Sequence, residues 1–420
     1  MRDTAHAPLP GARKTVDPKR LLSWLTRGLR RPPARPDDPH PMTLESLRSQ
    51  ISLTVIAGHP DRRALAQHIR PAYRDWQAQN WAGLGQRLSR LDQRHTALPS
   101  GERMAPALGQ ALFRHLVGAR ACQIIDRGQG VTDEDLPDTL FAPLDRALSR
   151  PDTPPAIHLF AAQIHLETSW ARRGETHAEL TPDDALAATR RHISMARQIL
   201  DGISDRSAGS AFHAELDYRL RAAEGSTEEA LTEAALRWST ADPTALTPHA
   251  VHGLHLLPRW YGSDHALAGY ADKIWSDTHT TLDAAGYAAC YLSAMEADPS
   301  VLLTLDIYGF RDGLIDMMQQ SDDPDVTCNA ILRVLWEVGS ETHGADARES
   351  TALRRARRDL RSVFAYLVHH ALGPVMPDVW GRGWNEDRIL PTLAEAFAPD
   401  IAEGRHIAIG MEGVVISDPA

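Results

Sequence analysis

The sequence of 420 residues is poor in cysteine, in lysine and in long apolar runs, and each shortage excludes a class of protein. Its three cysteines, Cys122, Cys290 and Cys328, lie far apart and form no Cys-x-x-Cys pair. This excludes a disulfide framework and the usual zinc spacings. No apolar run approaches the roughly 20 residues that a membrane helix needs. No charged-then-apolar leader is recognisable either. We therefore expect a cytoplasmic protein with reduced thiols and no transmembrane segment.

Lysine occurs only at Lys14, Lys19 and Lys273, so arginine carries almost all of the positive charge. A glycine-rich phosphate loop that ends in lysine is absent, and Schiff-base chemistry would depend on Lys273. The sequence also has no Gly-x-Ser-x-Gly turn, no His-Glu-x-x-His and no three-glycine dinucleotide turn. It therefore predicts no catalytic residue and no cofactor, and favours a protein that is not an enzyme. A Ser-His-Asp set assembled only by folding stays open.

The formal net charge of −10 is unevenly distributed. Residues 1–36 hold nine basic groups and two aspartates, a balance of +7, so residues 37–420 must carry −17 to reach the total of −10. An acidic body argues against a nucleic-acid partner, whose binding surface should be basic. Residues 19–31 could form a short helix that contacts an anionic membrane surface. Their short apolar face instead favours an unstructured arm or a helix docked on the body.

The chain divides into three expected parts. Residues 1–41 form a disordered basic arm and a proline-rich linker, and translation could begin at Met42, which directly precedes the first helical pattern. Residues 42–372 form a helical-repeat domain. Residues 373–420 form an irregular segment in which 405–409 and 413–416 could pair as a small hairpin. The predicted helices cover 43–57, 61–69, 72–94, 102–126, 137–149, 155–173, 182–202, 207–223, 227–240, 244–257, 264–278, 281–296, 299–318, 324–338 and 346–371.

This succession of helices with short connections predicts an all-α fold, a superhelix of stacked antiparallel helix pairs. Two short patterns support stacking. Trp81-x-x-Leu84-Gly85-x-x-Leu88 matches the first helix of a tetratricopeptide repeat with leucine in place of tyrosine, and Tyr291-x-x-Ala294 before Asp298-Pro299 matches the end of a second helix. No strict period is visible, so the repeats are divergent.

Three further stretches carry a resemblance to a family: Ile164 to Gly174, the helix end Ala196 to Leu200, and Leu257 to Ser263. Together they resemble bacterial tetratricopeptide-like proteins that are catalogued mainly as domains of unknown function. The resemblance covers about residues 110–300. It departs at Tyr261, where a second small residue is expected. The family implies a helical superhelix and supplies no reaction or catalytic residues.

The last of these stretches is an elbow between two helices, from Pro258 to Ser263. Pro258 ends the preceding helix, Gly262 can adopt a left-handed conformation, and Ser263 can cap the next helix. Between them stand Arg259, Trp260 and Tyr261, which together with Arg172 and Arg173 are the candidate partner-binding residues. Tryptophan and arginine are frequent hot-spot residues of interfaces. The alternative is structural: Trp170 and Trp260 pack the next repeat, and the arginines bond carbonyls at helix ends.

The sharpest cluster of ligand-type side chains is His249-x-x-His252-x-x-His255, which a helix places on one face. Imidazole is a good ligand for transition metals, so these residues are weak candidates for a metal site. The first and third histidines lie more than a turn apart, and no carboxylate follows at metalloprotease spacing. We therefore expect no metal. The sequence favours a protein-interaction or scaffold module that binds a peptide or partner protein, with a metal-dependent enzyme or sensor on this histidine face as the alternative.

Overall fold

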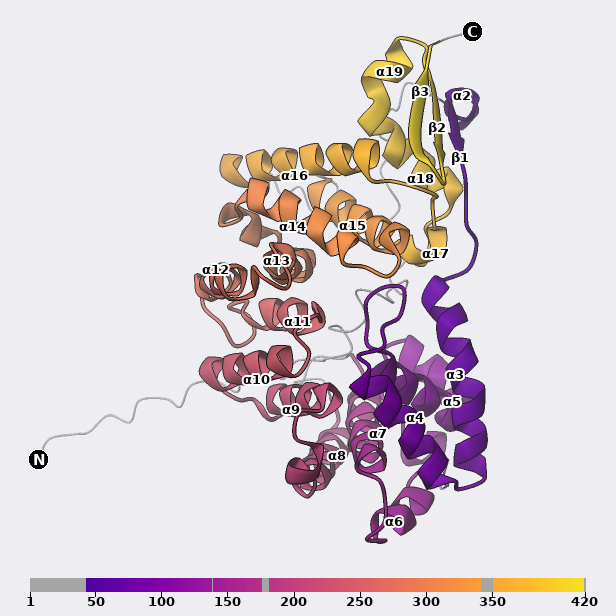
Figure 1. The fold of residues 1–420 in the computed structure, drawn as a ribbon, viewed down its shortest axis with the longest axis vertical. Coiled ribbons are helices and arrows are strands. Elements are labelled where there is room, and N and C mark those ends of the chain that lie inside the picture. The colour runs from indigo at the N-terminus through magenta and orange to yellow at the C-terminus, as the bar shows by residue number, and fades with distance from the viewer. Residues whose placement is uncertain (1–42, 138, 176–180, 341–349, 419–420) are drawn as a thin grey trace, which may run out of the picture.

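A computed structural model describes residues 43–137, 139–175, 181–340 and 350–418. Within these ranges the chain is a long stack of helices that ends in a small sheet (Figure 1). The predicted all-α superhelix of antiparallel helix pairs is confirmed. The predicted arm, linker and membrane-contacting helix within residues 1–41 lie outside the described residues. None of the helices in the described ranges is both long and apolar enough to cross a membrane.

The first part of the stack is built around α7, whose residues are buried along nearly its whole length. Its helices are α3 (Pro60–Gln77), α4 (Trp81–Gln93), α5 (Met104–Asp126), α6 (Ala142–Leu148), α7 (Pro155–Arg173) and α8 (Asp183–Asp201). The prediction placed a break before residue 72, but α3 continues through Pro71. The break falls instead at Gln79, whose φ is +50°, and Asn80 then caps α4 by accepting from the Gly83 N–H at 3.1 Å.

The second part continues with antiparallel pairs that stack onward from α9. Its helices are α9 (Ala211–Glu224), α10 (Glu228–Ala241), α11 (Thr247–His255), α12 (Ala266–Thr278), α13 (Ala285–Ala297), α14 (Ile307–Gln319), α15 (Pro324–Gly339) and α16 (Thr351–His370). The predicted helix at 299–318 is in fact two elements, the short 3₁₀ helix η4 (Pro299–Leu303) and α14. Asp306 starts the second by accepting from the Tyr308 N–H.

Among the described residues two large apolar cores meet at α9, and a third, small cluster joins α15 to the C-terminal part of the chain. The first takes Phe212, Leu216 and Leu220 from one face of this helix, and the second takes Tyr218 and Ala222 from the other. A helix that contributes to both cores must be apolar on opposite sides, which explains why α9 shows little one-sided patterning. Its position fixes the two halves of the stack relative to each other.

The C-terminal part contains more regular structure than predicted. Where an irregular segment is expected, the chain forms α17 (Pro377–Trp380), α18 (Glu386–Ala394), η5 (Glu395–Phe397) and α19 (Ala398–Ala402), and then the expected hairpin of β2 (His406–Gly410) and β3 (Gly413–Ser417). The prediction of one helix over 43–57 is wrong. That segment is α2 (Leu44–Gln50) followed by β1 (Ile51–Leu53), which pairs in parallel with β2. The N-terminal end of the described chain thus closes against its C-terminal hairpin (Figure 1).

Candidate functional site

The elbow at Pro258 is a tight turn between α11 and α12. Its backbone folds back on the end of α11, because the Trp260 N–H donates to Leu257 O at 2.8 Å and the Tyr261 N–H donates to His255 O at 3.1 Å. The predicted cap at Ser263 is wrong. α12 begins at Ala266, and the Ser263 contribution is its backbone carbonyl, which accepts from the Ala266 N–H at 3.2 Å.

Gly262 is required at this elbow for a different reason from the one predicted. Its φ lies outside the left-handed region, so conformational freedom is not the constraint. A Cβ at this position would lie 2.0 Å from the carbonyl oxygen of Leu256 and 2.4 Å from its carbon. Both are backbone atoms, which a rotamer change cannot move away. The turn therefore needs a residue without a side chain.

The three large side chains of the elbow serve the chain's own packing. The Tyr261 hydroxyl donates to Ala222 O at the end of α9, and burial raises its pKa to about 12. Trp260 is half-buried against the second core, and the guanidinium of the exposed Arg259 lies 5.2 Å from its ring centroid. The partner-binding role of these residues stays a prediction.

The other predicted elbow, at the end of α7, is buried. Trp170 is 2% exposed, Arg172 9% and Arg173 8%. Arg172 pairs with Asp133, and the Arg173 guanidinium lies 5.6 Å from the Trp170 ring centroid. Both arginines are enclosed by their own chain, so their predicted contact with a partner would require this end of α7 to open.

The three histidines of α11 lie on one buried face, as the spacing predicts, but their ring nitrogens contact tyrosine hydroxyl groups. The Tyr218 hydroxyl lies 3.1 Å from His252 Nδ1 and 2.6 Å from His255 Nδ1. The Tyr270 hydroxyl lies 3.2 Å from His249 Nδ1. Burial lowers the pKa of His249 to about 4 and those of His252 and His255 to about 3. Among the described residues no three histidine, cysteine or carboxylate side chains are gathered in a way that could hold a metal ion.

An open groove with a volume of about 750 Å³ lies between α9 and α10. The 3₁₀ helix η3 (Ser204–Ser207) and the start of α9 form one wall, and the second half of α10 forms the other. Its lining combines hydroxyl groups, charged groups and small apolar side chains: Ser204, Ser207, Ala208, Gly209, Ser210, His213, Ala214, Asp217, Glu233, Leu236, Arg237, Thr240 and Ala241. Such a surface can hold an extended peptide, whose backbone needs hydrogen-bond partners along its length.

Asp217 holds the floor of this groove rigid, because three arginines from three helices converge on it. Arg197 Nη1 lies 2.7 Å from its carboxylate, Arg221 Nε 2.9 Å and Arg237 Nη2 3.3 Å. Burial opposes its ionisation, but the hydrogen bonds from Arg221 and Arg197 outweigh that effect and lower the pKa of Asp217. The carboxylate stays charged at neutral pH and fixes α8, α9 and α10 together at the groove.

His213 lies in the wall of the groove and is neutral at physiological pH. Burial lowers its pKa, and the nearby Asp217 carboxylate only partly opposes this. Its Nδ1 contacts the hydroxyl of Ser207, and that hydroxyl donates its proton to Ile203 O at 2.8 Å. The Ser207 hydroxyl thus lies between the Ile203 carbonyl and the His213 ring in the wall of the groove.

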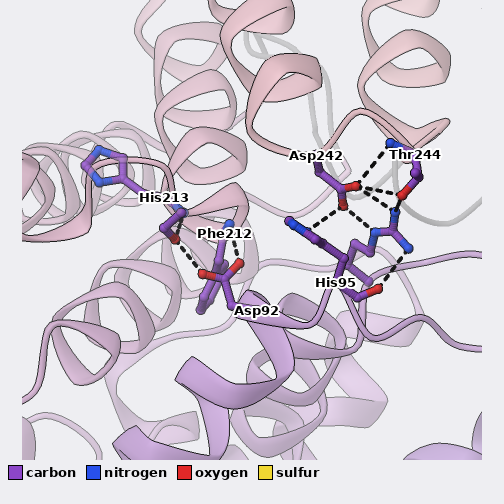
Figure 2. Close-up of polar contacts among 8 residues, drawn as sticks. Asp92, His95, Phe212, His213, Asp242 and Thr244 are labelled. Carbon is purple, nitrogen blue, oxygen red and sulfur yellow. Dashed lines mark hydrogen bonds and ion pairs between the residues drawn. The ribbon is translucent and has the colours of Figure 1, made fainter. Parts of the chain in front are cut away.

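The connection between α4 and α5 lies close to the start of α9 and the end of α10, the two helices that form the groove walls (Figure 2). We call its residues 94–103 the α4–α5 strap. Just before the strap, Asp92 accepts from Ser210 Oγ at 2.7 Å and from the Phe212 N–H at 2.9 Å, at the start of α9. At its end, Arg103 grips Asp242, the residue after α10, with Nε–Oδ2 at 2.5 Å and Nη2–Oδ1 at 2.8 Å. Asp92 and Arg103 stand on either side of this connection, and their contacts with α9 and Asp242 fix the distance between the two groove walls.

Asp242 is fully buried and collects several donors at this junction. Thr244 Oγ1 donates to Oδ1 at 3.0 Å, and His95 Nδ1 lies 3.3 Å from Oδ2. Arg103 also donates to His95 O at 3.0 Å and to Thr244 Oγ1 at 2.8 Å. A cavity of about 10 Å³ remains between the strap, α9 and Asp242, which is room for about one water molecule. The junction is a structural clamp and has no space for a substrate.

A second buried ionic cluster underlies the strap. Arg219 Nη2 donates to Glu167 at 2.8 Å and lies 3.6 Å through Nη1 from Glu215. Burial, reinforced by the charge of Asp61, raises the pKa of Glu102 to about 8. Burial raises that of Glu215 to about 7, against the attraction of Arg219. Several carboxyl groups therefore surround one guanidinium, and protonation of Glu102 and Glu215 reduces the excess negative charge.

Sequence reasoning found none of the groove residues. The serines at 204, 207 and 210 read only as polar residues before a helix, and Asp92, Arg103 and Asp242 stand in unremarkable surroundings. The one available signal was the hydroxyl-rich connection between α8 and α9, which exceeds what a single cap needs. The clamp has no local signal, because its two halves are 139 residues apart.

Comparisons with known proteins identify no relative. No family model matches the sequence, no curated protein matches it, and no solved structure matches its fold.

Proposed function

We propose that this protein is a helical-repeat interaction module that binds an extended peptide of a partner protein in the groove between α9 and α10. The observation that carries the proposal is the open groove of about 750 Å³, whose walls are held by Asp92 at the end of α4 and by Arg103 at the end of the α4–α5 strap. A preorganised groove loses little conformational entropy when a peptide docks. This favours binding over a merely structural hollow.

The lining indicates what kind of peptide fits. Three arginines already neutralise Asp217, whereas the carboxylate of Glu233 is exposed and lies 3.9 Å from Arg237. The hydroxyl groups can pair with a peptide backbone, and the alanine positions leave room for small side chains. We therefore expect an extended peptide with small apolar residues and at least one basic residue.

Location and class remain part of the proposal. Cys122, Cys290 and Cys328 carry free thiols, which agrees with a reducing cytoplasm. The resemblance to bacterial tetratricopeptide-like proteins agrees with the stacked helix pairs. The alternative, a metal-dependent enzyme or sensor on His249, His252 and His255, finds no support in rings already bonded to tyrosine and other hydroxyl groups.

A random peptide library displayed on phage tests the proposal. The purified full chain should enrich a consensus peptide with a basic residue, which is then synthesised with a fluorescent label and titrated by anisotropy. Thr240→Trp should weaken binding at least tenfold, because Thr240 is an exposed residue of α10 and the larger ring would fill the groove.

Glu229→Trp is the matched control. It places the same ring on an exposed position of α10 that does not line the groove, so binding should be unchanged. Arg259→Ala serves as a second comparison. If Arg259→Ala abolishes binding and Thr240→Trp does not, the peptide docks at the elbow and the groove assignment is wrong. No enriched consensus would remove the support for peptide binding altogether.

A further inference from the structure

The small sheet presents β3 as an open edge. Its strand order is β1-β2-β3, so β1 and β3 are both edges. Beyond Leu53 the β1 chain forms one isolated parallel bridge, in which Val375 donates to Thr54 O at 2.8 Å and accepts from the Ile56 N–H at 2.9 Å. No backbone hydrogen bond from the rest of the described chain reaches β3 outside its ladder with β2.

The register shows which groups of β3 face outward. Ile409 O accepts from the Thr54 N–H at 2.8 Å, so the peptide groups of Ile409 point toward the β1 side. Ile409 is therefore not hydrogen-bonded to its cross-strand partner Val414. Because bonded and non-bonded pairs alternate in an antiparallel ladder, the N–H and C=O groups of Val414 and Ile416 face the outer edge. Two donors and two acceptors stand there at the spacing of a strand.

The side chains of this edge are also apolar and accessible. Val415 is 56% exposed, Ile416 38% and Met411 65%. Proteins commonly protect open edges with lysine, proline or a bulge. β3 has none of these between Gly413 and Ser417. Water can satisfy these backbone groups in the free protein, and an extended chain can pair with the whole row at once, so the shape and chemistry of the edge fit an added strand.

Acidic residues at both ends of β3 decide against a second copy as that strand. An antiparallel pair of β3 strands that uses Val414 and Ile416 of both copies is centred on Val415. It sets Glu412 opposite Asp418 at each end. Like charges directly opposite each other destabilise a strand pair. The same two carboxylates would stabilise a strand with basic residues at its ends.

We propose that β3 is a docking edge for an extended segment of a partner protein, with alternating β-branched residues at its centre and basic residues at both ends. The segment adds to the sheet as a fourth strand, held by backbone hydrogen bonds to Val414 and Ile416. This site is independent of the groove between α9 and α10, since the sheet lies beyond α16 at the end of the stack (Figure 1).

A synthetic peptide of sequence Arg-Lys-Val-Thr-Val-Thr-Val-Lys-Arg, labelled with fluorescein, tests the edge by anisotropy with the full chain. Binding should be saturable, and a version with N-methyl groups at two central residues should bind at least tenfold more weakly, because it cannot donate to the edge. Hydrogen exchange of the Val414 and Ile416 N–H groups should be fast in the free protein and slow with the unmodified peptide.

Two variants complete the test. Ile416→Pro removes an outward N–H that the β2 ladder does not use, so the fold should persist while binding falls at least tenfold. Glu412→Lys should weaken binding, because the new positive charge repels the basic end of the peptide. Equal binding of the N-methylated peptide, or no binding, overturns the proposal. A concentration-dependent dimer that Ile416→Pro abolishes would show that a second copy occupies the edge. Slow hydrogen exchange in the free monomer would show that the chain covers its own edge. Either result also overturns the proposal.

Discussion

Arg103 and Asp242 form a bidentate ion pair across 139 residues of sequence, and Asp242 is completely buried in it. The pair joins the end of the α4–α5 strap to the end of α10 (Figure 2). A buried carboxylate is costly unless it is matched by a charge and further donors, and Thr244 and His95 supply the remainder. This contact sets the position of one groove wall.

Removing the guanidinium should destabilise the protein strongly. Arg103→Ala leaves the Asp242 carboxylate buried without its charge partner, so we expect a loss of about 3–5 kcal/mol in the free energy of unfolding, measured by urea titration. Arg150→Ala is the control, because the Arg150–Asp152 pair is exposed and screened by solvent, so its loss should change the free energy of unfolding little. Equal losses in the two variants would show that the clamp is not a special contact.

Gly262 should tolerate no side chain. Gly262→Ala places a methyl group against the Leu256 backbone, and we expect a loss of about 2 kcal/mol or more, since overpacking of this kind typically costs 1–3 kcal/mol. Gly269→Ala on α12 is the matched control. A Cβ there meets nothing within 4 Å, so the change should raise stability by about 0.5–1 kcal/mol through helix propensity. Melting temperatures that move in the same direction would contradict the steric account.

Variants of Trp260 and Arg259 should distinguish a role in packing from a role in partner binding. Trp260→Ala removes a half-buried ring from the second core and should cost about 2–3 kcal/mol, below the 3–5 kcal/mol of a fully buried tryptophan. Arg259→Ala alters an exposed side chain and should change the melting temperature little. If Arg259→Ala melts as early as Trp260→Ala, Arg259 is a structural part of the elbow.

Glu102 should make stability fall as the pH rises. Its pKa is raised from 4.5 to about 8 in the folded protein, so the folded state holds its proton more tightly than the unfolded state. The contribution is full below pH 4.5 and is lost as the pH rises through about 8, with a slope near 1.4 kcal/mol per pH unit inside that window. The variant Glu102→Gln cannot ionise. We would measure the free energy of unfolding of wild type and variant by urea titration from pH 5 to 9. The variant should become more stable relative to wild type as the pH rises, and the difference should level off above pH 8.

His252 should act in the opposite direction. Its pKa is lowered from 6.5 to about 3 by burial, so its contribution is present above pH 6.5 and is lost as the pH falls toward 3. His252→Gln should flatten the acid side of the stability profile relative to wild type. Metal analysis of both proteins should find no stoichiometric zinc, nickel or copper. A metal ion that is present in wild type and lost in the variant would restore the histidine face as a functional site.

Local features of the fold could be predicted because a helix is specified by neighbouring residues. The predicted helix at 155–173 matches α7, and the hairpin near the C-terminus matches β2 and β3. The elbow at Pro258 could also be predicted, since proline lacks the N–H that continues a helix and disfavours helical geometry in the residue before it. The prediction is wrong where a tertiary contact outweighs the local pattern. Residues 51–53 continue a helical pattern in the sequence, but in the structure they pair with β2.

The helical class, most helix positions and the histidine face can be predicted from the sequence. Folding of the whole chain is needed for the burial of Arg172 and Arg173, the contacts of those histidines with tyrosine hydroxyls, the Arg103–Asp242 clamp, the groove and the open β3 edge. The physical reason is the range of the forces involved. Helix hydrogen bonds join residues four apart, so the pattern that specifies them is visible in the sequence. Ion pairs, strand pairing and burial join residues far apart, and their partners become definite only when the helices are stacked.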